Sequence, residues 1–470
     1  MAAAARNKAL NLMRHVAKSW QHIAPETTAV TLNNKYGTTA DPQTQKEYAF
    51  EMACSNIRYG PGVTQEVGMD CNNLGAKLVC VMTDKYLRPL PAVQVVLESL
   101  ERHKVPYKLY DGCRVEPTDE SFKAAIDFSI KHEFDMFLAV GGGSVMDTCK
   151  AANLYSSKPD AELLDYVNAP IGKGLPVTHQ LKPLIAVTTT AGTGSETTGT
   201  AVFDYLPMKA KTGISNRALR PTLGIVDPLH LLTMPERVTA YSGIDVLCHA
   251  IESYTAVPYE ERVPRPENPN LRPAYQGCNP ISDIWSGHAL RMTNKYLKRS
   301  TYNKDDIEAR STMGLAASYA GIGFGNAGVH LCHGMSYPIS GLVKGFVSAD
   351  YDKDIPLVPH GLSVIISAPA VFEFMAPACP ERHLESAEFL GVDIRNKKAA
   401  DAGKVLGDRL REIMQDIGVP DGLEALGYTK DDIPALVKGT LPQHRVIKLA
   451  PRPQTEEDLT HIFENCMKVY

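Results

Sequence analysis

The feature that most constrains the fold is an alternation of short apolar runs with helix-patterned segments between residues 77 and 226. The run 77–84 is rich in valine and ends in polar residues, as strands buried on both faces of a parallel sheet do. Segment 87–103 then carries apolar residues at helical spacing. The same criteria predict further strands at 105–110, 134–140, 184–190 and 222–226, and helices at 118–131 (with Thr118 as N-cap) and 145–154. Such alternation predicts a parallel sheet with helices on both faces.

After Met234 and Pro235 the pattern changes to helices alone. Helical periodicity is found in the segments 237–254, 281–299, 305–319, 399–417 and 456–469. A chain of 470 residues is long enough for two substantial cores. We therefore predict an α/β nucleotide-binding domain over residues 45–235 and an all-helical domain over residues 236–470.

Charge and cysteine usage narrow the classes of partner. A formal net charge of −4 gives no reason to expect nucleic acid or an anionic membrane as a partner. No uninterrupted apolar run is long enough to span a bilayer. The ten cysteines include no Cys-x-x-Cys pair, so neither a zinc knuckle nor a disulfide framework is predicted. Small-molecule substrates are the expected partners.

The N-terminal segment 1–25 differs from the rest of the chain. It contains no Asp or Glu but carries Arg6, Lys8, Arg14 and Lys18, and its apolar residues can form one face of a helix. A basic, acid-free, amphipathic leader is typical of a mitochondrial transit peptide, whereas the alternative is an ordinary basic terminus. We expect the mature protein in the mitochondrial matrix.

A glycine-rich turn joins the predicted strand 134–140 to the predicted helix 145–154. Glycines let the backbone approach a diphosphate closely, and a helix N-terminus offers free N–H groups and a favourable dipole. The turn is not a Gly-x-Gly-x-x-Gly motif, because Met146 occupies the last position. The alternatives are a plain tight turn and a local helix cap. The candidate residues are Gly141, Gly142, Gly143, Ser144 and Asp147.

Asp84 stands at the carboxyl end of its predicted strand, where α/β sheets place ligands. A carboxylate there accepts hydrogen bonds from ribose hydroxyls and repels a 2′-phosphate. This favours NAD over NADP. The alternative role is the N-cap of the following helix.

Three separate segments carry residues suited to one metal ion. Asp245 and His249 are four residues apart in a proline-free segment, so on a helix they lie on the same face. His330 and His333 follow in a second segment, and His360 in a third. A carboxylate oxygen and imidazole nitrogens together can hold a divalent metal.

These segments resemble the metal signature of the iron-containing alcohol dehydrogenases. The matching runs are Gly-Ile-Asp-x-x-x-His-Ala-Ile-Glu at 243–252, Cys-His-Gly-Met at 332–335 and Pro-His-Gly at 359–361, and the resemblance extends from about Tyr59 onward. It implies the dehydroquinate synthase-like fold, with a metal in the cleft between the two predicted domains. It also implies four metal ligands, namely Asp245, His249, His333 and His360. The family implies Fe²⁺, whereas the donor set alone leaves Zn²⁺ open.

The resemblance also assigns cofactor residues. The run Gly-Gly-Gly-Ser-x-x-Asp matches the diphosphate loop of that family. By the same resemblance, Thr188, Thr189 and Thr193 flank NAD, and Lys211 reaches its ribose. A homo-oligomer, taken as a dimer, is expected.

The chain departs from the family at the expected proton path. Many members have a second histidine four residues after the third ligand, and Tyr337 occupies that position here. A tyrosine with its ordinary pKa of about 10 is a poor base. His330 is therefore a rival relay, and its alternative role is a core histidine or one that supports the metal ligands.

Two segments lengthen the chain relative to compact members of the family. The proline-rich stretch 258–280 carries Arg262, Arg265 and Arg272, and arginine suits bidentate recognition of carboxylates. The alternative is a solvated surface loop. The second segment, 341–359, separates the third and fourth ligands, and the sequence assigns it no role.

The family resemblance is greatest to a hydroxyacid-using member. That member oxidises 4-hydroxybutyrate to succinate semialdehyde while reducing 2-oxoglutarate to 2-hydroxyglutarate, with bound NAD carrying the hydride. The alternatives are a dehydrogenase that releases NADH after each turnover and a non-catalytic NAD-binding protein. The intact set of four ligands argues against the last.

Overall fold

The computed structural model describes residues 45–470 and divides into two compact units. Residues 1–44, which include the predicted transit segment, lie outside the described residues. The described part of the small unit consists of residues 45–49 and Glu260–Glu267, joined by backbone hydrogen bonds from Glu47 N to Arg262 O (2.9 Å) and from Arg265 N to Gln45 O (2.8 Å). The large unit comprises Phe50–Tyr259 and Asn268–Tyr470.

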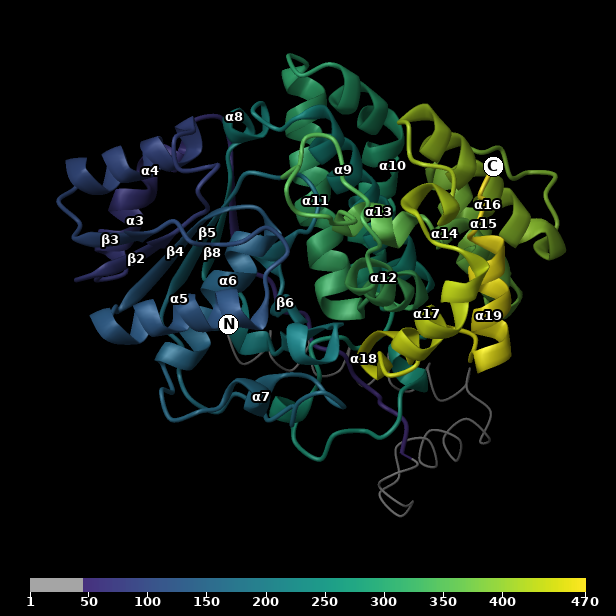
Figure 1. Ribbon diagram of the computed structural model, residues 1–470, viewed down its shortest axis with the longest axis horizontal. Helices are drawn as coiled ribbons and strands as arrows, with labels where there is room; N and C mark the ends of the chain where they lie inside the picture. Colours follow the sequence, from purple (N-terminus) through teal and green to yellow (C-terminus); the bar gives the residue numbers. More distant parts are fainter. Residues whose placement is uncertain (1–44) are drawn as a thin grey trace, which may run out of the picture. The chain divides into compact units, whose positions relative to one another are not determined.

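A parallel six-stranded sheet forms the first part of the large unit (Figure 1). Its strand order is β1-β8-β5-β4-β2-β3. The strands are β1 (Asn56–Tyr59), β2 (Val79–Met82), β3 (Tyr107–Tyr110), β4 (Met136–Gly141), β5 (Leu184–Thr188) and β8 (Leu223–Val226). The predicted parallel sheet is confirmed, and β1 is an additional edge strand that the apolar pattern did not reveal.

Alternate residues of each strand pack on opposite faces of this sheet. Val79 and Val81 contribute to one core with α3 and α4, whereas Cys80 and Met82 contribute to the other with α5 and α6. Figure 1 shows the two helix pairs on opposite sides of the strands. The helices are α3 (Val67–Asn73), α4 (Pro91–Arg102), α5 (Asp119–His132) and α6 (Gly143–Ser156). Thr118 caps α5 as predicted, accepting a hydrogen bond from Ser121 N at 3.2 Å.

An antiparallel hairpin, β6 (Thr200–Tyr205) and β7 (Ala210–Ser215), lies outside the main sheet and was not predicted. Its residue Phe203 packs against Phe122 of α5, with ring centroids 4.9 Å apart. The short helix α7 (Leu163–Tyr166) contributes to the same cluster. This hairpin brings Lys211 to the edge of the site described below.

Helices follow the last strand of the sheet in the described part of the chain. They are α8 (Pro228–Leu231), α9 (Glu236–Thr255), α10 (Pro280–Tyr302), α11 (Ile307–Ala327), α12 (Leu331–Gly341), α13 (His360–Ile365), α14 (Ala368–Met375), α15 (Pro380–Phe389), α16 (Ala402–Asp416), α17 (Ile433–Thr440), α18 (His444–Ile447) and α19 (Glu456–Asn465). The five helices predicted beyond residue 235 are present, whereas the short ones among these were not foreseen. Division of the chain into domains at residue 235 stays a prediction. Within residues 45–470, no helix combines the length and apolar character needed to cross a membrane.

Helix α11 continues well past its predicted end at residue 319. Gly321, Gly323 and Gly325 suggest a break in the sequence, but here the first two allow close contacts with neighbouring segments. A Cβ at Gly321 would lie 2.3 Å from Thr197 Oγ1, and one at Gly323 would lie 2.3 Å from Ser286 Oγ. The glycines therefore serve packing rather than termination.

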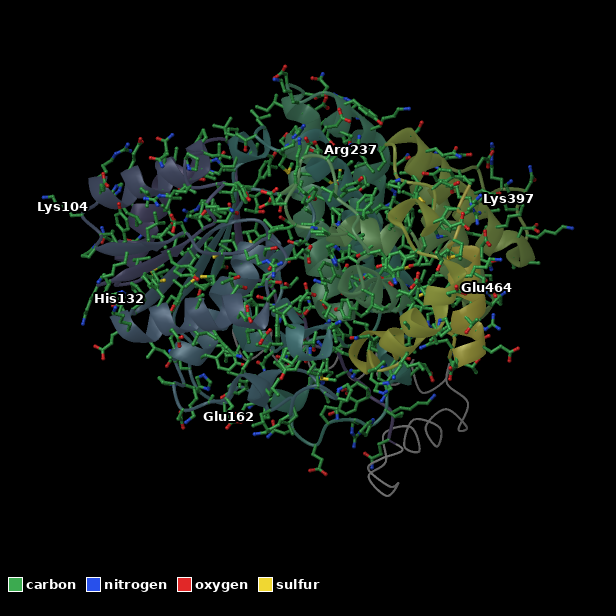
Figure 2. All side chains as sticks on the ribbon, in the orientation of Figure 1. Lys104, His132, Glu162, Arg237, Lys397 and Glu464 are labelled. Carbon is green, nitrogen blue, oxygen red and sulfur yellow. The ribbon has the colours of Figure 1, made fainter. Side chains whose placement is uncertain are left out.

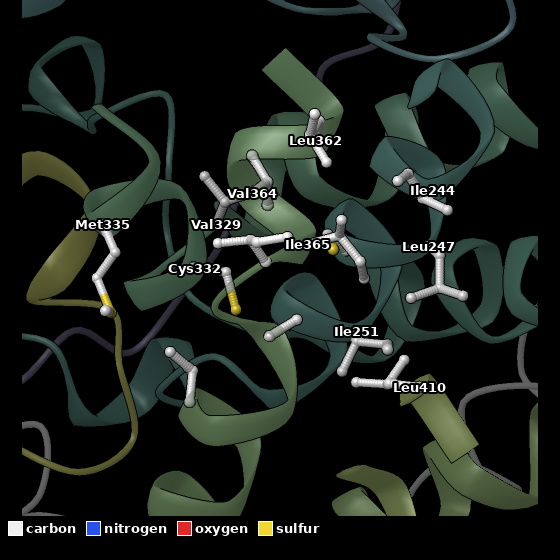
Figure 3. Packing of buried hydrophobic residues seen from close by; sticks show 14 of the residues in the cluster. Ile244, Leu247, Ile251, Val329, Cys332, Met335, Leu362, Val364, Ile365 and Leu410 are labelled. Carbon is white, nitrogen blue, oxygen red and sulfur yellow. The ribbon is translucent and has the colours of Figure 1, made fainter. Parts of the chain in front are cut away.

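An apolar core joins the helices that carry the predicted metal ligands. Ile244 and Leu247 of α9, Cys332 of α12 and Leu362 of α13 are completely buried together (Figure 3). Charged residues such as Lys397 lie instead on the exposed surface (Figure 2). All ten cysteines are free, as expected from their spacing.

Gly361 sets the distance between α13 and α9. A Cβ at this position would lie only 1.9 Å from the backbone oxygen of Tyr241, and 3.1 Å from Cβ of Asp245. Any side chain at residue 361 must therefore push the two helices apart. The close approach of α13 and α9 also brings two predicted metal ligands together, His360 on α13 and Asp245 on α9.

We expect Gly361→Ala to lower the free energy of unfolding by about 1–3 kcal/mol or more, because overpacking forces backbone shifts. Gly325→Ala is the matched control, since its Cβ would lie 3.4 Å from Thr198 Cγ2 in ordinary contact. Alanine also favours a helix over glycine by about 1 kcal/mol. Denaturant titration of both variants measures the difference, and equal stabilities would contradict the close-approach argument.

Candidate active site

The four predicted metal ligands converge from three helices. Asp245 and His249 come from α9, His333 from α12, and His360 begins α13. One ligand atom from each residue lies within 4.8 Å of the others. Asp245 Oδ1 lies 3.8 Å from His249 Nε2, and 3.7 Å from Nε2 of both His333 and His360. The predicted helical stacking of Asp245 and His249 is confirmed.

This donor set fits a divalent metal ion. Ligand atoms about 2.1 Å from a tetrahedral metal are roughly 3.4 Å from one another, close to the separations observed. Asp245 Oδ1 and His333 Nε2 are buried, and within residues 45–470 neither has a hydrogen-bond partner. Buried polar atoms without partners are costly, so these orphaned atoms indicate a ligand between them.

The electrostatics of the cluster also favour a cation. Burial alone would raise the pKa of Asp245, but the imidazoles of His249 and His360 outweigh burial and lower it. Burial lowers the pKa of His249 to about 3. Burial opposes protonation of His333 too, yet the carboxylates of Glu252 and Asp245 raise its pKa to about 9. A bound metal would take the place of that proton, as metals do at histidine sites.

Glu252 holds His333 in position, a role that the sequence analysis did not assign. Its carboxylate accepts hydrogen bonds from His333 Nδ1 and from Cys332 N (2.7 Å). Partners of this kind fix the ring orientation of a metal-ligating histidine. The available signal was helical spacing, because Glu252 lies about two turns after Asp245 on α9.

His330 lies in the core beside this carboxylate. Its side chain is fully buried, its Nδ1 accepts a hydrogen bond from Leu331 N (2.8 Å), and its Nε2 lies 2.9 Å from Thr255 Oγ1. It lines neither of the two cavities described next. Burial lowers its pKa to about 4. This geometry favours its role as a core and supporting histidine, and we do not propose it as a proton relay.

A cavity of about 880 Å³ adjoins the ligand cluster and collects most of the predicted cofactor residues. Its lining includes Asp84, Gly142, Gly143, Ser144, Thr189, Thr193, Asp245 and His360. Asp84 is not the N-cap of α4, because that position is Leu90, and its contact with the ribose stays a prediction. Its carboxylate accepts from Tyr86 N (2.8 Å) and Leu87 N (2.9 Å), which caps the following turn, and it also lines the cavity.

The glycine turn packs directly on the threonine turn after β5. A Cβ at Gly143 would lie 2.7 Å from Thr193 Cγ2, and one at Gly142 would lie 3.0 Å from Thr190 Cγ2. Gly142 is the N-cap of α6, so the free N–H groups of the first helical turn face this region. Gly141 and Thr188 lie behind the turn and line neither cavity.

Ser144 and Asp147 do not form the helix cap considered as an alternative, because α6 has no side-chain cap. Ser144 Oγ accepts from Glu116 N at 3.1 Å. Asp147 accepts from Ser195 Oγ and Val202 N, both at 2.9 Å. These hydrogen bonds join α6 to the threonine turn and to β6.

A second, smaller cavity of about 110 Å³ also adjoins the cluster. Its lining includes His249, His333, His360, Glu116, Asp147, Lys211, Tyr275, Tyr337 and Arg445. The ammonium of Lys211 contacts the carboxylates of Glu116 (2.7 Å) and Asp204 (3.0 Å). Burial opposes this charge, but the two carboxylates raise the pKa of Lys211 above its ordinary value. Glu116, which lines both cavities, was not anticipated from the sequence.

Tyr337 lies in this smaller cavity and faces an arginine. Its hydroxyl accepts a hydrogen bond from Arg445 Nη2 at 2.6 Å. Burial raises the pKa of Tyr337, although Arg445 acts against that rise. A phenol of this kind keeps its proton near neutral pH. Arg445 is an isolated basic residue outside any motif, so sequence reasoning did not identify it.

The two lengthening segments differ in their position. In 341–359, Tyr351 and Asp352 line the larger cavity, and the Tyr86 hydroxyl donates to Asp352. Segment 341–359 therefore borders the larger cavity. Arg272 ends a short turn, Pro269–Leu271, and lines neither cavity.

Arg262 and Arg265 belong to the small unit. Arg265 contacts Gln45 and lies over the ring of Tyr48 at 5.0 Å. Substrate binding by any of the three predicted arginines therefore stays a prediction.

Known proteins resemble this chain over almost its whole length. A model described as iron-containing alcohol dehydrogenase matches residues 54–228, and one for the C-terminal part of that family matches residues 274–467. The hydroxyacid-oxoacid transhydrogenase, mitochondrial, of Rattus norvegicus is 63% identical over 470 residues, which cover 100% of both chains. The protein of the same name from Homo sapiens is 62% identical over 470 residues, again covering 100% of both.

A solved structure supports the same relationship. The crystal structure of 1,3-propanediol oxidoreductase matches with a TM-score of 0.77 and 27% sequence identity, covering 89% of this chain and 100% of that one. Together with a metal cluster built from the matching residues, these findings establish that the chain belongs to the iron-containing alcohol dehydrogenase family.

Proposed function

We propose that this oxidoreductase is a metal-dependent hydroxyacid-oxoacid transhydrogenase. It oxidises 4-hydroxybutyrate to succinate semialdehyde and reduces 2-oxoglutarate to 2-hydroxyglutarate. The observation that carries the proposal is that the metal-ligand cluster is shared by the two cavities. The larger is bordered by the glycine and threonine turns, and the smaller, of about 110 Å³, is lined by His249, His333 and His360. The names of the relatives supply the substrate class.

Asp245, His249, His333 and His360 would hold the metal, with Fe²⁺ proposed from the family and Zn²⁺ compatible with the same donors. When bound, a divalent metal acts as a Lewis acid that lowers the pKa of an alcohol and polarises a carbonyl. Glu252 keeps the Nε2 atom of His333 directed into the cluster. The protein's contribution is thus a fixed set of four donors.

NAD is proposed to occupy the larger cavity. Gly142, Gly143 and Ser144 would bind its diphosphate at the start of α6, and Asp84 would accept hydrogen bonds from its ribose. When bound there, NAD would carry the hydride between the two substrates. The ammonium of Lys211 already contacts the carboxylates of Glu116 and Asp204. To bind the ribose as predicted, it would have to donate a hydrogen bond in addition to these two contacts.

The proposed location is the mitochondrial matrix. The relatives above carry a mitochondrial designation, and the basic, acid-free leader supports import. A homodimer stays a prediction. The alternative reaction is that of a dehydrogenase that releases NADH after each turnover. An isotope-transfer experiment distinguishes the two reactions.

We expect His333→Ala to lose the bound metal, because it removes one of the four donors. Glu252→Gln should weaken metal affinity about ten- to hundredfold, since it frees the ring of His333. His461 on α19 is exposed and lines neither cavity, so His461→Gln is the control and should retain the metal. Metal analysis of the purified variants measures these outcomes, and full occupancy in His333→Ala would refute the assignment.

Asp84 can be tested by removing its charge while keeping an oxygen acceptor. Asp84→Asn should narrow the preference for NAD over NADP, because repulsion of a 2′-phosphate is lost. Equilibrium titration of both nucleotides measures the ratio of affinities. An unchanged ratio, with lower stability, would show that Asp84 only caps its turn.

Isotope transfer separates a transhydrogenase from a dehydrogenase. If NAD stays bound, deuterium from the hydroxyl-bearing carbon of 4-hydroxybutyrate should appear in 2-hydroxyglutarate even with a large excess of unlabelled NADH. Ping-pong kinetics should accompany this transfer, because the oxidised product leaves before the acceptor enters. Mass analysis detects the label, and its dilution by the free NADH would support the dehydrogenase instead.

A further inference from the structure

Arg445 lines the smaller cavity and has one donor that is not used within the described part of the chain. It lies on α18 beside α12 (Figure 1), with its Nη2 donating to the Tyr337 hydroxyl and its guanidinium 5.1 Å from the ring centroid of Tyr275. Its other terminal nitrogen, Nη1, is buried and has no hydrogen-bond partner in the described part of the chain. A buried guanidinium nitrogen left in this way is costly unless a ligand accepts from it.

The charge of Arg445 is also unbalanced. Within residues 45–470, no carboxylate lies within 4.0 Å of its guanidinium nitrogens. Lys211, the other long basic side chain that lines this cavity, is neutralised by Glu116 and Asp204. The smaller cavity therefore contains one arginine whose guanidinium contacts none of the carboxylates described in its lining, Glu116 and Asp147.

We propose that Arg445 and Tyr337 bind the substrate carboxylate that is remote from the reacting carbon. Arg445 Nη1 donates one hydrogen bond to this carboxylate, and the Tyr337 hydroxyl, which accepts from Nη2, donates a second. This inference rests on the proposed function, because it identifies the group that makes the enzyme select acids over neutral alcohols.

One such contact serves both half-reactions. In 4-hydroxybutyrate, two methylene groups separate the carbon that bears the hydroxyl from the carboxylate. In 2-oxoglutarate, two methylene groups likewise separate the keto carbon from the remote carboxylate. A single cation at a fixed position relative to His249 and His333 can therefore align either substrate with the same metal position. Positioning residues of this kind contribute through orientation of the reacting atoms.

The assignment differs from the one based on the proline-rich segment. Arg262, Arg265 and Arg272 were predicted from local composition, whereas Arg445 lines the same cavity as three of the metal ligands. Arginine is better suited than lysine to this task, because its planar fork can contact Tyr337 and the carboxylate at the same time.

The test compares acid and neutral substrates in the metal-loaded full-length enzyme. Arg445→Gln should raise KM for 4-hydroxybutyrate about ten- to hundredfold, as expected for loss of a charge-assisted hydrogen bond. The ratio of kcat/KM for 4-hydroxybutyrate to that for 1,4-butanediol should fall by a similar factor. Arg445→Lys, which keeps the charge, should show an intermediate ratio.

Arg452→Gln is the matched control. Arg452 lies in the same C-terminal region, but it donates to Phe374 O (2.9 Å) and lines neither cavity. Its replacement should leave the acid-to-diol ratio within about threefold of the parent, well below the effect of a lost charged hydrogen bond. Metal content and thermal unfolding show whether each variant is intact. If Arg445→Gln does not fold, the acid-to-diol ratio of kcat/KM in Arg445→Lys is the test. A lower ratio than in the parent supports the role of Arg445, and an unchanged ratio overturns it.

A binding measurement separates this inference from the proposed reaction. Calorimetric titration of the metal-loaded enzyme with butyrate should show about ten- to hundredfold weaker binding in Arg445→Gln. Failure of the parent enzyme to transfer label from 4-hydroxybutyrate to 2-oxoglutarate overturns the transhydrogenase but not this contact. Equal losses for acid and diol, or unchanged butyrate affinity, overturn the role of Arg445.

Discussion

The site depends on burying two carboxylates, Asp245 and Glu252, in a helical core. Both lie on α9, and burial alone would raise the pKa of each. The surrounding imidazoles reverse that effect, and Glu252 reaches a pKa of about 2. Removing either partner would leave a charge without compensation in an apolar environment, which is far more costly than losing a surface ion pair. The convergence of α9, α12 and α13 is therefore coupled to the chemistry of the site.

The position of this cluster explains how one chain can combine a nucleotide with an acid substrate. Asp245 faces the larger cavity, His249 and His333 face the smaller one, and His360 borders both. Glu116 connects them further, because it lines both cavities and holds the ammonium of Lys211. A reacting carbon near His360 would have the cofactor on one side and the acid-binding groups on the other.

Much of the fold could be predicted from the sequence because the responsible patterns are local. Valine-rich strands such as 79–82 are buried on both faces, so their apolar runs are continuous. The hairpin β6–β7 was missed because both strands are only partly buried and β7 contains lysine and glycine. Helix α11 was predicted too short because glycine normally indicates a break, whereas here it allows contact with Thr197 and Ser286.

Some residues of the candidate site could be predicted from local motifs, and others could not. The four metal-ligand candidates stand in recognisable runs, and the structure brings them together. Arg445 and Glu116 lie in no motif, and only the three-dimensional arrangement brings them to the cavities. The sequence offered Asp84 either a local capping role or a place in the cofactor site. In the structure its carboxylate caps a turn, and the same residue lines the larger cavity. Contacts between distant segments were beyond the reach of patterns read along the chain.

The origin of the ligands in three helices has a thermodynamic consequence. Asp245 and His360 are far apart in the sequence, and Gly361 allows their helices to approach closely. An ion that binds this arrangement, but not the unfolded chain, acts as a reversible cross-link between the two segments. At a free concentration of about a thousand times Kd it would add about 4.1 kcal/mol to the free energy of unfolding. The availability of the metal would then set the lifetime of the folded enzyme as well as its activity, so that depletion of the ion would expose the protein to proteolysis.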